Sequence, residues 1–162
     1  MTFPSSDRVT SKTACFAPLL ILACIPIDSI SAKFKGVNAM LETEDMADPF
    51  IVSSVFQRCA GVYGALAKIL PSGDPTTSAL KQTSFSLTTE FGAGAIIMLN
   101  VKNQNTGARN QEQVMQAVKS YIDIYYREMN QSQINTGSIF SEWGQAEFSI
   151  CNQLRPGLDQ LK

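Results

Sequence analysis

The stretch from Asp48 to Leu70 constrains the fold most, because it has the pattern of a long helix with one apolar face. Asp48 can cap a helix start, and Pro49 is tolerated at the first helical position. Pro71 ends the pattern. The apolar residues recur at alternating spacings of three and four: Val52, Val55, Cys59, Val62, Leu66 and Ile69.

The same periodicity predicts three further helices, over 76–102, from about 111 to 129 and from 138 to 154. The polar stretch 130–137 is an expected loop, and a short pattern within 33–45 allows one more helix. Short polar connections make consecutive helices antiparallel neighbours. We therefore predict an all-α protein, an up-down-up-down four-helix bundle with room for a short extra N-terminal helix.

Glycines interrupt two of these helical patterns. Gly61 and Gly64 each cost a helix roughly 1 kcal/mol relative to alanine, so they indicate either close helix contact or a weak helix. Gly92 and Gly94 predict a kink or break in the second long helix.

Cys59 lies within the first long helix and Cys151 within the last. At 1.5 Å per residue, the two lie roughly 16 and 20 Å from the end that the two helices share. Similar depths in adjacent helices predict a disulfide. The alternative is a pair of free cysteines that act as small apolar side chains.

The first 32 residues have the plan of a secretory signal peptide. A polar start with Arg8 and Lys12 precedes the apolar run 14–27, and small residues lead to Ala32. The run is shorter than the ~20 residues that span a membrane. We therefore expect cleavage after Ala32, which leaves 33–162 as a single helical domain with no membrane span.

Two other fates of this segment stay open. Residues 13–32 are retained as a membrane anchor in one, and Cys24 becomes a lipidated N-terminus in the other, although Leu22 fits that motif poorly. With cleavage, Cys59 and Cys151 are the two cysteines that remain. An exported chain meets an oxidising compartment, which favours the disulfide and a periplasmic or extracellular location.

The composition and net charge of the chain exclude several classes of functional site. The chain has no histidine, which excludes Ser-His-Asp and Cys-His catalysis and HExxH zinc sites. A net charge of −1 argues against a nucleic-acid partner. The acidic cluster 42–48 lacks the spacing of a calcium loop. The sequence therefore predicts no metal site and no cofactor.

Aromatic residues gather near the predicted connection between the third and fourth long helices. Most are expected to fill the core. Tyr126 and Trp143 are the candidates for contact with a partner, because exposed aromatic residues are common anchors. The other members of the group are Tyr121, Tyr125 and Phe140.

The function expected from the sequence is that of a small exported protein with a binding or structural role and no catalysis. Its partner would be an unidentified protein or a component of the cell envelope. One alternative is a membrane-tethered accessory subunit. Another is a histidine-free hydrolase that uses Asp or Glu, for example Glu90 with Lys68 or Arg58.

Overall fold

The computed structural model describes residues 36–102 and 107–161, and the secondary structure of this part is helical throughout. The expected signal peptide, Cys24 and the anchor alternative lie outside the described residues. The helices belong to the compact unit Phe34–Lys162. They are α2 (Val37–Thr43), α3 (Pro49–Ile69), α4 (Pro75–Lys102), α5 (Gly107–Thr136) and α6 (Glu142–Asp159).

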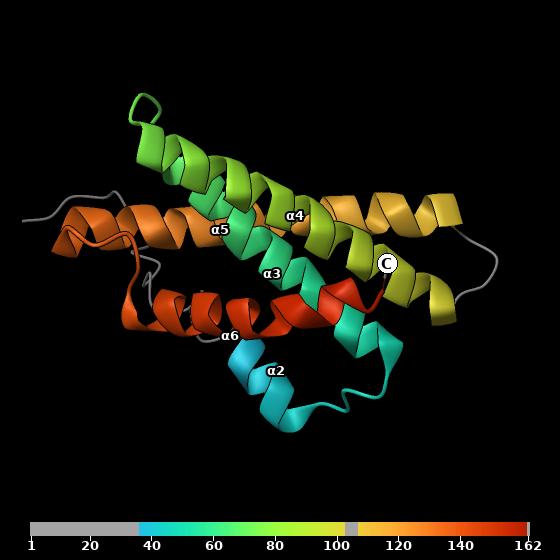
Figure 1. Ribbon diagram of the computed structural model, residues 1–162. Coiled ribbons are helices and arrows are strands. Elements are labelled where there is room, and N and C mark those ends of the chain that lie inside the picture. Colours follow the sequence, from blue (N-terminus) through green and yellow to red (C-terminus); the bar gives the residue numbers. More distant parts are fainter. Residues whose placement is uncertain (1–35, 103–106, 162) are drawn as a thin grey trace, which may run out of the picture. The chain divides into compact units, whose positions relative to one another are not determined.

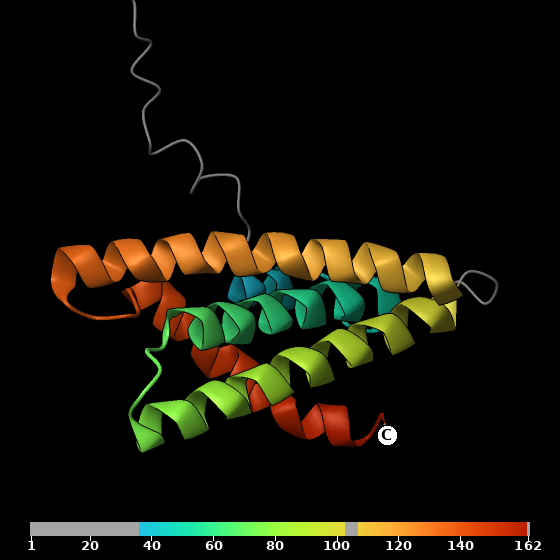
Figure 2. The same cartoon turned by 90° about the horizontal axis from the view of Figure 1, so that it is seen from above.

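The four long helices alternate in direction, as Figure 1 and Figure 2 show, and α2 is the short additional helix. The all-α, up-down-up-down four-helix bundle is thereby confirmed. Figure 2 shows α3 between α4 and α5, and α6 also packs against α3. The central helix of the domain is therefore α3.

The predicted start of α3 is confirmed. Asp48 caps the helix by accepting a hydrogen bond from the amide of Phe50 at 2.9 Å, and Pro49 takes the first helical position. Lys102 at the end of α4 donates to both carboxylate oxygens of Asp48 at 2.8 Å. The hydrogen bond from Lys102 is the main cause that lowers the pKa of Asp48.

Among the described helices, α3 alone is long and apolar enough to cross a membrane by length and composition. The core helix of a domain has the same properties, and 67% of the apolar stretch of α3 is buried inside the domain. Twelve of its 21 residues are buried. Packing against the other helices thus accounts for the apolar character of α3.

The predicted disulfide is present. Cys59 of α3 and Cys151 of α6 are fully buried and bonded to each other, with their Cα atoms 5.4 Å apart. The bond joins positions 92 residues apart in the sequence. It closes most of the domain into one covalent loop.

The predicted bounds of the third long helix are wrong. The helix α5 begins at Gly107 and continues through most of the expected loop 130–137. It continues because Ser132 is buried on the same face as the preceding seam. Gly137 ends it in a left-handed conformation with φ of 76°, and its amide donates to the carbonyl of Gln133 at 3.0 Å.

The predicted bounds of the fourth long helix also need correction. The helix α6 begins at Glu142, where Ser141 accepts a hydrogen bond from the amide of Gly144 at 3.1 Å. It then continues through Pro156 to Asp159. The exposed Pro156 is tolerated because Leu158, which is buried, holds the last turn against the domain.

The break expected in α4 at Gly92 and Gly94 does not occur, since the helix is continuous. Gly94 allows close packing, because a Cβ there would lie 2.9 Å from Leu158. Gly61 of α3 is similar, since a Cβ at this position would collide with Tyr121 of α5. These two glycines therefore mark close helix contacts.

We expect the double variant Cys59→Ala/Cys151→Ala to lose up to about 4–5 kcal/mol of unfolding free energy, because the unfolded chain regains the entropy of a 92-residue loop. Urea unfolding measures the loss. The oxidised protein with reductant added should unfold like the variant. A loss below about 1 kcal/mol would show that noncovalent packing alone holds α6.

Gly61→Ala should destabilise the protein by about 1–3 kcal/mol, because overpacking against Tyr121 outweighs the better helix propensity. Gly92→Ala is the matched control. A Cβ at Gly92 has no neighbour within 4 Å, so that variant should gain up to about 1 kcal/mol. Thermal and urea unfolding of both variants check the difference, and equal effects would contradict close α3–α5 contact.

Candidate functional site

A concave site lies between α4 and α6. Two hollows of about 360 and 420 Å³ share Leu87 and Glu90 of α4 and Arg155 of α6. We call the first hollow the α4–α6 groove. Its lining is Leu87, Glu90, Asn152, Arg155, Pro156, Leu158 and Asp159.

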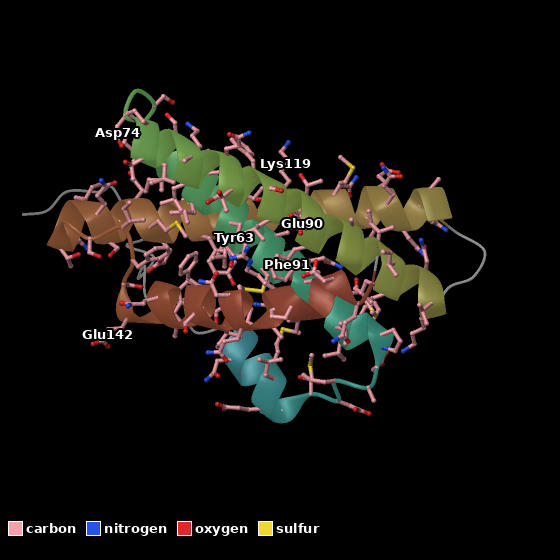
Figure 3. All side chains as sticks on the ribbon, viewed as in Figure 1. Tyr63, Asp74, Glu90, Phe91, Lys119 and Glu142 are labelled. Atoms are coloured by element: carbon pink, nitrogen blue, oxygen red, sulfur yellow. A yellow bond between two sulfur atoms is a disulfide. The ribbon has the colours of Figure 1, made fainter. Side chains whose placement is uncertain are left out.

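The wall of the groove is fixed by the core behind it. The hydroxyl of Tyr63 in α3 donates to the side-chain oxygen of Asn152 at 2.7 Å. The Tyr63 ring stacks on Phe91, with ring centroids 5.7 Å apart, and Figure 3 shows Glu90 and Phe91 as neighbours on α4. Glu90 in turn accepts a hydrogen bond from Ser86, one turn earlier, at 2.9 Å.

Burial raises the pKa of Tyr63 to about 12, and the positive charge of Arg155 partly opposes this effect. The phenol therefore stays protonated at physiological pH and acts as a hydrogen-bond donor to Asn152.

The groove carries charges of both signs. Arg155 is exposed, and within the described ranges no hydrogen bond or ion pair engages its guanidinium. The carboxylates of Glu90 and Asp159 line the same hollow. One cation and two anions thus line one small space.

The hydrolase hypothesis names Glu90 with Lys68 or Arg58. Glu90 lines the groove, and neither Lys68 nor Arg58 is among the residues that line it. Lys68 pairs with Asp123 of α5 at 3.2 Å, and Arg58 lies over the ring of Tyr121, 5.1 Å from its centroid. Both residues therefore face α5, and the basic group in the groove with Glu90 is Arg155.

The two candidate partner-binding residues are half-buried and pack against the core. The ring of Tyr126 lies beneath the amine of Lys68, 4.3 Å from the centroid. Trp143 stacks on Tyr125, with ring centroids 5.3 Å apart. Each keeps part of its surface accessible, and their contact with a partner stays a prediction.

The sequence reasoning missed a buried carboxylate. Glu147 of α6 is 1% exposed and accepts hydrogen bonds from the amide of Val37 at 2.9 Å and from the hydroxyl of Tyr125 at 2.7 Å. Its position was a usable indication, because Glu147 lies four residues after Trp143 and four before Cys151 on the apolar seam. The carboxylate joins α2, α5 and α6.

Burial, followed by the negative charge of Glu147, raises the pKa of Tyr125 well above its ordinary value. Tyr125 therefore remains a hydrogen-bond donor to this carboxylate. Gly36 lies against the same group, because a Cβ there would collide with the Glu147 carboxylate. The network thus holds Gly36 and Val37 against α6.

A second carboxylate supports the connection between α5 and α6. Glu128 is half-buried and accepts a hydrogen bond from the hydroxyl of Ser141, the residue that caps α6. Burial raises the pKa of Glu128, and the hydrogen bond from Ser141 opposes the increase. The ionised form of Glu128 is therefore disfavoured in the folded state.

No group of three His, Cys, Asp or Glu residues that could hold a metal ion occurs in the ranges 36–102 and 107–161. Comparison of the chain with protein-family models, with curated proteins and with solved structures found no match.

Tyr125→Phe should lower the unfolding free energy by about 1.5–3 kcal/mol, because it removes a donor from a buried carboxylate. Glu147→Gln should also destabilise the protein, and the double variant should lose less than the sum of the two losses. Tyr126→Phe is the control, since its ring is half-buried and within the described part its hydroxyl makes no hydrogen bond. Strict additivity in urea unfolding would contradict the Tyr125–Glu147 coupling.

The raised pKa of Glu128 predicts a pH dependence. Protonated Glu128 contributes its full stabilisation below the pKa of glutamate in the unfolded chain, roughly 4.3. This stabilisation is lost as the pH rises through the pKa of Glu128 in the folded protein. Glu128→Gln should therefore gain stability relative to the native protein between pH 4 and pH 7 in urea unfolding. Glu112→Gln, at an exposed position of α5, controls for the loss of one charge. An equal gain in both variants would contradict the assignment to Glu128.

Proposed function

We propose that this is a small exported helical protein with a binding role and no catalysis, which works in the periplasm or outside the cell. The observation that carries the proposal is the buried disulfide between Cys59 and Cys151. Disulfides form and persist in oxidising compartments and are rare in reducing ones. A disulfide at the centre of the domain therefore supports a location outside the reducing cytoplasm.

The order of features along the chain agrees with this location. The segment 1–32 has the pattern of a signal peptide, and both bonded cysteines come after it. Val37, whose amide donates to Glu147, follows closely after the expected cleavage site at Ala32. Cleavage there would leave the disulfide and the Glu147 network intact.

The α4–α6 groove supports a binding role. It combines the guanidinium of Arg155 with the carboxylates of Glu90 and Asp159 over apolar side chains. Arginine stays protonated in proteins, so Arg155 can orient a charged group but cannot act as a general base. The residues of the groove thus suit recognition of a ligand or partner more than proton transfer. Tyr126 and Trp143 remain candidates for contact with a larger protein or cell-envelope partner.

A histidine-free hydrolase is the second candidate, favoured by one observation. Glu90 and Asp159 line a single hollow, and paired carboxylates can serve as acid and base. This function requires turnover that Glu90→Gln abolishes. Binding without turnover supports the first proposal instead.

The first test is the intact mass of the protein recovered after expression with its own N-terminus, under non-reducing conditions with and without an alkylating agent. We expect the mass of Lys33–Lys162 less two hydrogens, with no alkylation. The Cys59→Ala/Cys151→Ala variant gives the reference for an unbridged chain. A full-length chain that is alkylated at its cysteines would contradict export and oxidation.

The same preparation distinguishes the membrane-tethered alternative from the exported protein. A full-length, oxidised protein that stays in the membrane pellet after carbonate extraction would indicate that residues 13–32 are retained as an anchor. Processed protein in the soluble fraction supports the exported form.

A further inference from the structure

We propose that the α4–α6 groove binds a small zwitterion, namely a free α-amino acid with an aliphatic side chain. This inference rests on the proposed binding function and names the ligand class of that site. The carboxylate of the ligand would pair with Arg155 of α6. Its ammonium group would face Glu90 of α4.

The charges of the groove select this class of ligand. A purely anionic ligand that reaches Arg155 also meets the carboxylates of Glu90 and Asp159. A purely cationic ligand meets the guanidinium of Arg155. A zwitterion can satisfy both signs at once, and the planar guanidinium can donate two parallel hydrogen bonds to a carboxylate.

The size and lining of the groove favour a small ligand with an apolar part. Its volume of about 360 Å³ lies at the lower end of the range that holds small molecules. The exposed Pro156 contributes apolar surface, and the edges of the buried Leu87 and Leu158 lie beneath it. An aliphatic side chain would cover this surface while the charged groups of the ligand stay near the rim.

The polar wall adds hydrogen-bonding groups that the protein has already oriented. Tyr63 occupies the side-chain oxygen of Asn152 at 2.7 Å, which leaves the amide nitrogen of Asn152 as a donor. An ammonium group requires several acceptors, and the carboxylates of Glu90 and Asp159 supply them.

The test is a calorimetric titration of the oxidised protein with three matched probes. L-Leucine carries both charges, 4-methylpentanoate lacks the ammonium group, and 3-methylbutylamine lacks the carboxylate. We expect leucine to bind with a Kd on the order of 1 mM or tighter, and each singly charged probe to bind at least about tenfold more weakly. Equal affinities for all three probes, or no heat with leucine at about 10 mM, would overturn the proposal.

Charge-removing variants locate the site. Arg155→Gln should reduce leucine affinity to the level of the amine probe, and Glu90→Gln should reduce it to the level of the carboxylate probe. Neither side chain is buried, so both variants should keep the disulfide and the helical circular dichroism of the native protein. Arg109→Gln and Glu112→Gln, at exposed positions of α5, are the controls. Leucine binding that survives both groove substitutions would overturn the assignment.

The two proposals can fail separately. Oxidised, processed protein that does not bind leucine would end the amino-acid proposal and leave export intact. Leucine binding by a full-length protein with reduced cysteines would end the export proposal and leave the groove assignment intact.

Discussion

The bond between Cys59 and Cys151 fixes α6 against the central helix α3, and the position of the groove depends on it. The helix α6 is amphipathic and has only four buried residues among its 18, so packing alone holds it less firmly than α3. The loop-closure entropy that the bond removes from the unfolded chain is of the same order as the whole stability of a small domain, roughly 5–15 kcal/mol. The disulfide therefore fixes the position of α6, which forms the side of the groove opposite α4.

A buried carboxylate joins α6 to two further helices, α2 and α5. Glu147 is removed from water, which costs several kcal/mol unless hydrogen bonds replace the lost solvation. The amide of Val37 and the hydroxyl of Tyr125 supply those bonds from α2 and α5. The short helix α2 is thereby held to α6 by more than its few apolar contacts. A buried carboxylate in this position requires donors from α2 and α5, so it fixes the arrangement of these two helices and α6.

The two halves of α6 thus have different roles. Its part from Glu142 to Cys151, which includes Trp143 and Glu147, contacts α2, α3 and α5. Its last turns, with Arg155 and Asp159, extend past Pro156 and present charges beside α4. A rigid frame beside an exposed, charged surface is the arrangement that a preoriented binding site requires, because little conformational entropy is lost when a ligand binds.

The sequence by itself determined the helical class, the cap at Asp48 and the pairing of the cysteines, because helical periodicity and the rise per residue are local geometry. It did not determine the ends of α5 and α6, since the burial of Ser132 and Leu158 depends on distant helices. The sequence places Glu147 on the apolar seam, but only tertiary structure supplies its hydrogen-bond donors, the amide of Val37 and the hydroxyl of Tyr125. Arg155, the basic residue that lines the groove with Glu90, was likewise placed there by tertiary structure, because α6 had to lie beside α4.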